Sequence, residues 1–319
     1  MIKHYSVMLN EVIDSLNIKE DGIYVDGTLG RGGHTKAILQ KLTTGCMYCF
    51  DKDIKAIEET KEILKDYLDK VTFIHDDFDK AYKILKEKNI NEIDGFLLDL
   101  GVSSPQFDDS ERGFSYRFNA RLDMKMDQSQ SLSAYEVVNQ YTFSELMRIL
   151  YEYGEESNAK LIARGIEKAR LIKPIETTFE LVDVIKKSLP MKVLSKKGHP
   201  AKQTFQAIRI EVNNELSQLS QSVYDLCELL KVNGRGSILT FHSLEDRIVK
   251  NVFKDLSTAP FVNTKIPLLP SQMEQASYSL VNKKPIIATK EELEENNRSH
   301  SAKLRIIERV KGKKDGKDC

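Results

Sequence analysis

Tryptophan is absent from this 319-residue chain, cysteine occurs only four times, and the 48 Lys and Arg residues balance 48 Asp and Glu. Four cysteines in a chain of this length exclude a disulfide scaffold. No uncharged apolar run approaches the ~18 residues of a membrane span, and the first residues lack the apolar stretch of a signal peptide. A net charge of zero argues against a uniformly basic nucleic-acid binder but allows a local basic face. We therefore expect a cytoplasmic protein without a membrane segment.

The first hundred residues alternate short apolar runs with stretches of helical periodicity. Strands are predicted at 23–25, 46–50, 71–74 and 96–98, and helices at 35–42, 54–68 and 79–88. The apolar runs are nearly continuous, as in strands that are buried on both faces of a parallel sheet. This pattern predicts an α/β, doubly wound fold.

An all-helical segment interrupts the alternation after Gly101. No strand pattern occurs between 106 and 203. Three capping boxes, in which a hydroxyl and a carboxylate satisfy free N–H groups, predict helices that begin after Ser133, Thr142 and Thr177. Because a chain of this length holds about two domains, we expect this segment to be an insertion within one sheet domain.

The strand pattern resumes after one long predicted helix. Apolar residues recur at helical spacing from 204 to 231, and Gly234 is expected to end this helix. Strands are predicted at 237–241, 285–288 and 302–310. The predicted sheet domain therefore comprises 1–105 and 209–319, and the helical insertion comprises 106–208.

A glycine-rich loop, Gly27 to Gly33, joins the first predicted strand to the first helix. Glycine allows a sharp turn and a close approach to a ligand, and a helix N-terminus favours an anion. Thr35 stands where the dinucleotide fingerprint G-x-G-x-x-G has its third small residue. Asp51, at the end of the second strand, suits the ribose of NAD or S-adenosylmethionine, or else caps the next helix. The pattern indicates a nucleotide-type cofactor, with a simple tight turn as the alternative.

The fourth predicted strand ends in the sequence Asp99-Leu-Gly-Val-Ser-Ser-Pro-Gln106. Ligands bind at the carboxyl ends of parallel strands. An acidic residue with a Ser-Pro turn at this edge resembles the element of amino-methyltransferases that orients an exocyclic amine toward a methyl sulfonium. Orientation and electrostatics carry such a reaction without a strong base. The alternative for Asp99 is a buried carboxylate that caps a loop.

Seven segments, in order along the chain, resemble the ribosomal RNA small subunit methyltransferase H family, also called MraW. They are His4–Val12, Tyr24–Thr35, Leu97–Gln106, Glu111–Ser115, Leu122–Asp127, His199–Ala207 and Phe241–Val249. The resemblance implies a class I, Rossmann-like methyltransferase sheet, mostly parallel with an antiparallel C-terminal strand, interrupted by the helical insertion. It implies S-adenosylmethionine as cofactor. It implies as substrate the 4-amino group of a cytidine in 16S rRNA, at the decoding region of the small ribosomal subunit.

The resemblance also assigns residues by position. Cofactor contacts are expected from Gly32, Gly33, His34, Asp51, Phe78, Asp99 and Gln106. Asp99 and Ser103 are expected to be catalytic, with backbone carbonyls near Ser103 helping to orient the amine. The chain departs from the family pattern at Arg121, where Pro is usual, and at Lys125, where Arg is usual. Lysine keeps the charge but loses the bidentate fork of arginine.

Substrate contacts are expected from two further places. His242 and Ser243 follow the fifth strand, where they either face the target base or begin a helix with Ser243 as its cap and Asp246 as the partner. The stretch 186–209 has seven Lys or Arg residues and no acid, so Lys202 and Arg209 are candidates to contact RNA phosphates. Aromatic residues that follow the fourth strand are candidates to stack on the base: Phe107, Phe114, Tyr116 and Phe118.

No metal site is predicted. The six histidines show no pair at the i, i+4 spacing of a zinc helix. Cys46 and Cys49 form a single C-x-x-C pair within a predicted strand, where residues three apart point to opposite faces, so we expect buried thiols.

Three other functions stay open: a DNA amino-methyltransferase, an RNA-binding ribosome-assembly factor without activity, and a nicotinamide dehydrogenase. Thr35 and the Ser-Pro element disfavour the dehydrogenase. The joint presence of Gly30, Gly32, Asp51 and Asp99 disfavours the inactive factor. The sequence is compatible with a monomer or a homodimer.

Overall fold

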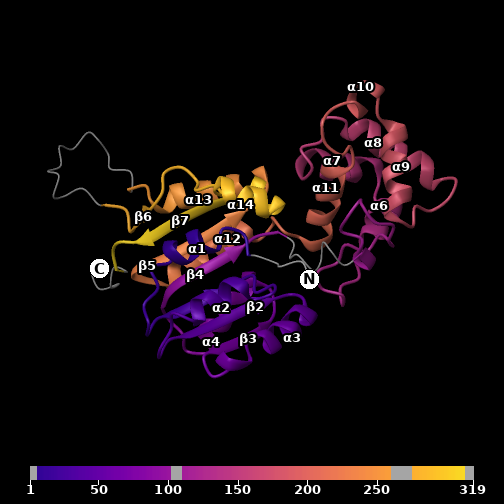
Figure 1. Ribbon diagram of the computed structural model, residues 1–319. Coiled ribbons are helices and arrows are strands. Elements are labelled where there is room, and N and C mark those ends of the chain that lie inside the picture. Colours follow the sequence, from indigo (N-terminus) through magenta and orange to yellow (C-terminus); the bar gives the residue numbers. More distant parts are fainter. Residues whose placement is uncertain (1–5, 102–109, 260–274, 313–319) are drawn as a thin grey trace, which may run out of the picture. The chain divides into compact units, whose positions relative to one another are not determined.

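The computed structural model describes residues 6–101, 110–259 and 275–312. The chain divides into two compact units (Figure 1). Unit 1 comprises Met1–Gly101 and Gln218–Cys319, and unit 2 comprises Val102–Ser217. In the described ranges, no helix combines the length and the apolar character that crossing a membrane requires.

Unit 1 is built on a seven-stranded sheet in the order β3-β2-β1-β4-β5-β7-β6. Its strands are β1 (Ile23–Asp26), β2 (Cys46–Asp51), β3 (Val71–His75), β4 (Ile93–Asp99), β5 (Leu230–Thr240), β6 (Tyr278–Leu280) and β7 (Lys303–Arg309). The first five strands pair in parallel, and β7 is antiparallel to both of its neighbours, β5 and β6. The predicted α/β fold, with a mostly parallel sheet and an antiparallel C-terminal strand, is confirmed.

Helices cover both faces of this sheet (Figure 1). On one face, α1 (Leu9–Ser15), α2 (Gly33–Leu39) and α3 (Ile54–Ile63) share a core with Tyr24, Leu97 and Leu239 of the strands. On the other face, α12 (Leu219–Leu229) contacts both α4 (Ala81–Glu87) and α13 (Ser243–Leu256). The short elements of unit 1 are η1 (Lys65–Tyr67), η2 (Phe78–Lys80), α14 (Lys290–Glu295) and η5 (Asn297–Ser301).

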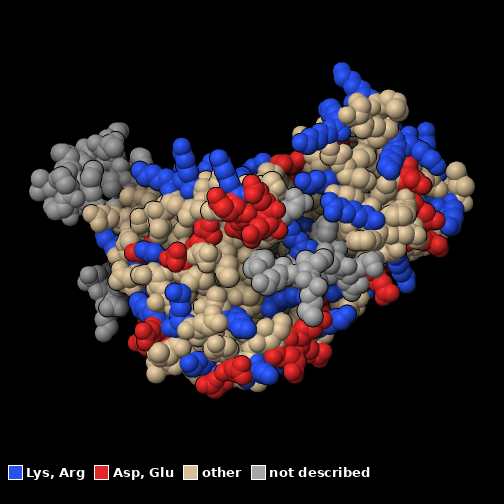
Figure 2. Space-filling model, in the orientation of Figure 1, with Lys and Arg blue, Asp and Glu red and all other residues tan. Residues whose placement is uncertain are grey.

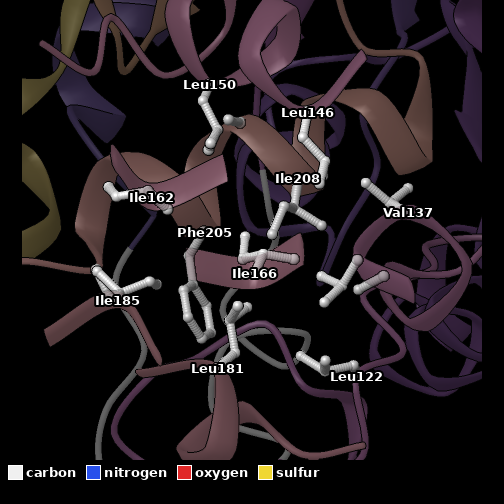
Figure 3. Close-up of a cluster of buried hydrophobic side chains, with 14 of the residues drawn as sticks. Leu122, Val137, Leu146, Leu150, Ile162, Ile166, Leu181, Ile185, Phe205 and Ile208 are labelled. Carbon is white, nitrogen blue, oxygen red and sulfur yellow. The ribbon is translucent and has the colours of Figure 1, made fainter. Parts of the chain in front are cut away.

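Unit 2 is helical and has its own hydrophobic core (Figure 3). Its elements are η3 (Ser110–Arg112), α6 (Ala134–Gln140), α7 (Phe143–Glu152), α8 (Ala159–Arg170), α9 (Thr178–Ser188), α10 (Met191–Leu194) and α11 (Lys202–Asn213). The capping boxes predicted at Ser133, Thr142 and Thr177 are confirmed, each with a glutamate as the partner. Between residues 110 and 203 the described chain forms no strand, although Arg121 and Thr177 pair in an isolated bridge.

The long helix predicted over 204–231 is wrong, because the chain forms two helices there, α11 and α12. Asn214 ends α11 in the left-handed conformation, with a φ of 53°, which asparagine tolerates better than most residues. The preceding Asn213 turns inward, and its side-chain oxygen accepts a hydrogen bond from the N–H of Met126 (2.7 Å). Gly234 does not end a helix either, because it lies within β5. The expected boundary at 208 falls inside α11, which continues unbroken across it.

The strand predicted at 285–288 is also wrong. Within this range Ile286 pairs with Leu304 in an isolated bridge, and the strand next to β7 is instead β6. Pro285 has no N–H to donate to a ladder. The side chain of Asn282 also pairs with β7, because its amide group donates to the carbonyl oxygen of Leu304 (3.0 Å) and its oxygen accepts from the N–H of Ile306 (2.9 Å).

Cys46 and Cys49 both lie in β2 with free thiols. Cys49 is buried and Cys46 is half-buried. Burial raises the pKa of both thiols, so neither is an activated nucleophile.

Candidate active site

Three adjacent parallel strands each end in an aspartate. Asp26, Asp51 and Asp99 are the last residues of β1, β2 and β4. Strand β1 lies between the other two, and its register places Asp26 beside Cys49 on one side and Leu97 on the other. The three carboxyl groups therefore gather at the carboxyl edge of the sheet, where open α/β sheets bind ligands.

The glycine loop between β1 and α2 is closely enclosed by neighbouring side chains. Gly30 and Gly32 have φ angles of 50° and 67°, which favour glycine. A Cβ on Gly32 would lie 2.5 Å from Cγ2 of Thr60, and a Cβ on Gly27 would lie 2.9 Å from Cβ of Phe78. Phe78, on η2, therefore packs directly against the loop.

Asp51 is oriented by backbone N–H groups. Its Oδ2 accepts from Gly30 (2.8 Å) and its Oδ1 accepts from Asp53 (2.8 Å). The cap of α3 is Asp53, whose side chain accepts from the N–H of Lys55 (3.1 Å). The alternative of Asp51 as the helix cap is therefore wrong. Burial raises the pKa of Asp51 to about 6, against the opposing effect of its hydrogen bonds, and each oxygen keeps a further lone pair for a ligand hydroxyl.

Asp99 has a carboxyl oxygen without a partner. Its N–H donates to Oγ1 of Thr28 (2.6 Å), which fixes the end of β4. In the part of the chain that the structure describes, Oδ1 is buried without a hydrogen bond, and Oδ2 lies 3.7 Å from Nδ1 of His34. Burial, and then the nearby carboxyl groups of Asp26 and Glu245, raise the pKa of Asp99 to about 8. A strongly perturbed carboxyl with an unsatisfied acceptor is typical of a functional site.

Asp26 is a residue of this sheet edge to which the sequence patterns gave no role. Its carboxyl group is buried, and it accepts hydrogen bonds from the hydroxyl of Thr35 (2.6 Å) and the N–H of Thr28 (3.0 Å). Burial raises the pKa of Asp26. The signal was present in the sequence, because Asp26 ends an apolar strand just before a loop, as Asp51 and Asp99 do.

A family model described as the MraW methylase family matches residues 1–310. The chain belongs to this methylase family. It is 53% identical over 311 residues to ribosomal RNA small subunit methyltransferase H from Streptococcus dysgalactiae subsp. equisimilis, a match that spans 97% of this chain and 98% of the relative. The resemblance read from the sequence is confirmed.

Two solved structures are similar to this methylase at low sequence identity. An rRNA methylase from Streptococcus thermophilus is 12% identical, with a TM-score of 0.40 over 95% of this chain and 94% of that one. A SAM-dependent O-methyltransferase from Thermotoga maritima is 8% identical, with a TM-score of 0.40 over 98% of this chain and 70% of that one.

A histidine and a glutamate of the methylase meet where β5 passes into α13. His242 is the N-cap of α13, and its Nδ1 accepts from the N–H of Glu245 (3.4 Å). Glu245 is buried, and its Oε2 accepts from the N–H of Phe241 (2.8 Å). The cap anticipated at Ser243, with Asp246 as its partner, is therefore wrong. Asp246 instead forms ion pairs with two basic residues of β7.

The predicted substrate-binding cations differ in their surroundings. Arg209 makes two hydrogen bonds of 2.9 Å to Glu215 within unit 2, so its guanidinium is engaged in the fold. Lys202 is exposed at the first position of α11. Lys125, one of the departures from the family pattern, directs its ammonium to the carbonyl oxygens of Gln128 (3.3 Å) and Gln130 (3.4 Å). Lys125 therefore stabilises the loop in which it lies.

The aromatic residues predicted to stack on the base also differ in their surroundings. Phe114 is buried in the core of unit 2 and is a packing residue. The ring of Tyr116 stacks on the ring of His199, with centroids 4.2 Å apart, and Phe118 is exposed. Three predicted residues lie outside the described ranges: Ser103, Gln106 and Phe107.

Proposed function

We propose that this methylase transfers a methyl group from S-adenosylmethionine to the 4-amino group of a cytidine in 16S rRNA, at the decoding region of the small ribosomal subunit. Membership of the MraW methylase family supports the reaction class, and the name of the 53% identical relative supports the RNA. The observation that carries the amino chemistry is the unpartnered Oδ1 of Asp99 at the carboxyl end of β4.

The strand ends suit S-adenosylmethionine, which supplies a methyl group activated on a cationic sulfonium. Gly32 and Gly33 allow the tight loop conformation, closely packed by Thr60 and Ser6, whose backbone we assign to the cofactor. Asp51 offers lone pairs to the ribose hydroxyls, and the ring of Phe78, packed against the loop, offers a face to the adenine. Asp99 and Gln106 are the residues we assign to the methyl-donor end.

Asp99 is suited to orient the attacking amine. The lone pair of a base amine is conjugated with the ring, so the amine is a weak nucleophile until acceptors hold its N–H groups and direct that lone pair. Oδ1 of Asp99 is an acceptor without a partner in the described chain. No strong base is required, because the amine becomes acidic once it is alkylated. Because burial and its acidic neighbours raise the pKa of Asp99 to about 8, Asp99 serves here as an orienting acceptor, and the acidic methylated amine releases its proton to water.

Unit 2 supplies the RNA-facing surface in this proposal, and unit 1 binds the cofactor. The segment 186–209 has seven basic residues and no acid. Lys196, Lys197 and Lys202 are exposed, and Figure 2 shows Lys and Arg side chains around the α10 end of unit 2. Such cations bind phosphates and release counterions. His199 lies within this segment and stacks on the ring of Tyr116. Its ring offers a flat surface for an unstacked base.

The deciding experiment is methyl transfer from labelled S-adenosylmethionine to small ribosomal subunits that lack the modification. Naked 16S rRNA and duplex DNA are tested in parallel. Label recovered as 4-methylcytidine from the subunit RNA supports the proposal and the cytoplasmic location that goes with this substrate. Label in duplex DNA would instead assign a DNA amino-methyltransferase. RNA binding without any affinity for S-adenosylmethionine would assign an inactive assembly factor.

A pair of variants tests Asp99 itself. Asp99→Ala is expected to lower methyl transfer by about 100-fold, because an electrostatic and orienting acceptor is lost. Asp69→Ala, which removes an exposed carboxyl in the turn before β3, serves as the matched control. Binding of S-adenosylhomocysteine is measured on both by calorimetry. Full activity of Asp99→Ala with unchanged binding would contradict the assignment.

A further inference from the structure

The N-terminal segment Ser6–Met8 lies directly on the glycine loop. A Cβ placed on Gly33 would come within 2.0 Å of Oγ of Ser6, so the side chain of Ser6 fills the space beside this glycine. One residue further along, the carbonyl oxygen of Val7 lies 3.0 Å from Nε2 of His34. The segment therefore contacts two successive residues at the start of α2.

The contact with Val7 determines which nitrogen of His34 carries the proton. A carbonyl oxygen can only accept, so Nε2 must donate, and the neutral ring then has a bare lone pair on Nδ1. Burial lowers the pKa of His34 to about 4, which keeps the ring neutral near pH 7. The Nδ1 lone pair lies 3.7 Å from Oδ2 of Asp99. His34 thus presents Asp99 with an acceptor rather than with a cation or a donor.

Nearby acidic groups affect the pKa values of both His34 and Asp99. Asp99 is influenced by the carboxyl groups of Asp26 on β1 and Glu245 on α13. His34 is influenced by Glu292 on α14. Both acidic neighbours of Asp99 disfavour its ionisation, so the carboxyl can carry a proton directed to the Nδ1 acceptor of the ring.

The segment is held in place by a residue far along the chain. Met8 is fully buried with a φ of 51°, and its N–H donates to Oε1 of Glu292 (2.7 Å). The hydroxyl of Ser299 donates to the same oxygen. Glu292 is itself fixed, because its N–H donates to Oγ1 of Thr289, the N-cap of α14 (3.2 Å). The side chain of Glu292 therefore links the chain that precedes β7 to the N-terminal segment Ser6–Met8.

We propose that Glu292 is a positioning residue for methyl transfer, which acts through Met8 and Val7 to hold His34 in the Nε2–H form beside Asp99. The proposal rests on the proposed function for the role of Asp99. It assigns no contact with substrate or cofactor to Glu292. It makes the proton position on His34 the quantity that Glu292 controls.

The first test determines which ring nitrogen of His34 carries the proton. Nitrogen-15 shifts of the six labelled histidines are recorded by NMR, and the His34 signals are identified from their loss in His34→Gln. The proposal requires a protonated Nε2 and a bare Nδ1 in the wild-type protein. A wild-type ring with its proton on Nδ1 would overturn it, whatever the activity of any variant.

Three variants of α14 then test the connection. Glu292→Leu removes the acceptor of the Met8 N–H and is expected to lower kcat on the order of 10- to 100-fold, with mixed His34 tautomers and a changed pH profile of kcat. Glu292→Gln keeps an oxygen acceptor and is expected to retain the wild-type shifts and profile. Glu294→Leu alters an exposed glutamate of the same helix and controls for the loss of charge.

The outcomes separate the two proposals. Wild-type protein that does not methylate small subunits defeats the proposed function, while the His34 shifts still report on the tautomer. Glu292→Leu that loses thermal stability but keeps the wild-type shifts and pH profile shows a merely structural role and overturns this inference. Should Glu292→Leu fail to fold, the wild-type tautomer remains decisive, because a proton on Nδ1 of His34 overturns the inference without any variant.

Discussion

Asp99→Asn is expected to stabilise the methylase while it removes activity. Because the pKa of Asp99 is about 8 in the fold against 3.8 as its ordinary value, the unfolded chain loses this proton at a lower pH than the folded chain does. The cost to folding therefore begins as the pH rises above 3.8 and grows by up to ~1.4 kcal/mol per pH unit until about pH 8. The asparagine has no ionisation and escapes this cost.

The magnitude follows from the exposure of the side chain. With 29% of the Asp99 side chain exposed, solvent weakens the full effect, and we expect a gain of roughly 3 kcal/mol at pH 7. Urea unfolding of wild type and variant is measured at intervals from about pH 5 to about pH 8. The difference between their free energies of unfolding should increase with pH across this range.

The control is Asp69→Asn, which changes an exposed carboxyl and should show a small difference at every pH. A difference for Asp99→Asn that stays constant from about pH 5 to about pH 8 would refute the raised pKa. It would also remove the reason for regarding Asp26 and Glu245 as acidic neighbours that shape this site. Loss of methyl transfer in the same variant tests the catalytic role separately.

Three further predictions concern the cofactor, the RNA and the helical core. Asp51→Asn should weaken S-adenosylhomocysteine binding by about 10- to 100-fold in calorimetry, because hydrogen bonds to a charged group are lost. The control Asp53→Ala removes the cap of α3, so it should lower the free energy of unfolding by about 1 kcal/mol and leave binding near wild type. The reverse pattern would contradict the assignment of Asp51 to the cofactor. Changing Lys196 and Lys197 together to Gln should lower affinity for 16S rRNA and reduce the slope of log affinity against log salt by about 1.4 to 1.8. An unchanged slope would show that the RNA does not contact these two residues. Ile166→Ala should destabilise unit 2 by about 2–5 kcal/mol in urea, while S-adenosylhomocysteine binding at low urea persists; loss of binding would show that the units do not unfold separately.

The features that could be predicted are those that neighbouring residues encode. The apolar runs that end in Asp51 and Asp99 predicted parallel strands and the polar groups at their ends. The capping boxes at Ser133 and Thr142 predicted helix starts, because hydroxyl and carboxylate need only their own turn to find N–H groups.

The features that could not be predicted depend on residues far apart in the chain. Nothing in the local pattern shows that Asn282 pairs with β7 or that Asn214 adopts a left-handed conformation. The link between Met8 and Glu292 exists only because the sheet brings both ends of unit 1 together. Family resemblance assigned cofactor contacts by position, but it did not reveal the buried acceptor of Asp99.

The placement of unit 2 between β4 and β5 has a consequence for biosynthesis. A ribosome delivers β1 to β4 first, then the whole of unit 2, and only afterwards β5 and β7. Until then one edge of β4 is unpaired, whereas unit 2 can close around its own core. Glu292 follows β5 along the chain, so a chain released before this residue lacks the contact that holds its N-terminal segment. The methylase that we propose to modify ribosomes thus completes its site only after Glu292 has been synthesised.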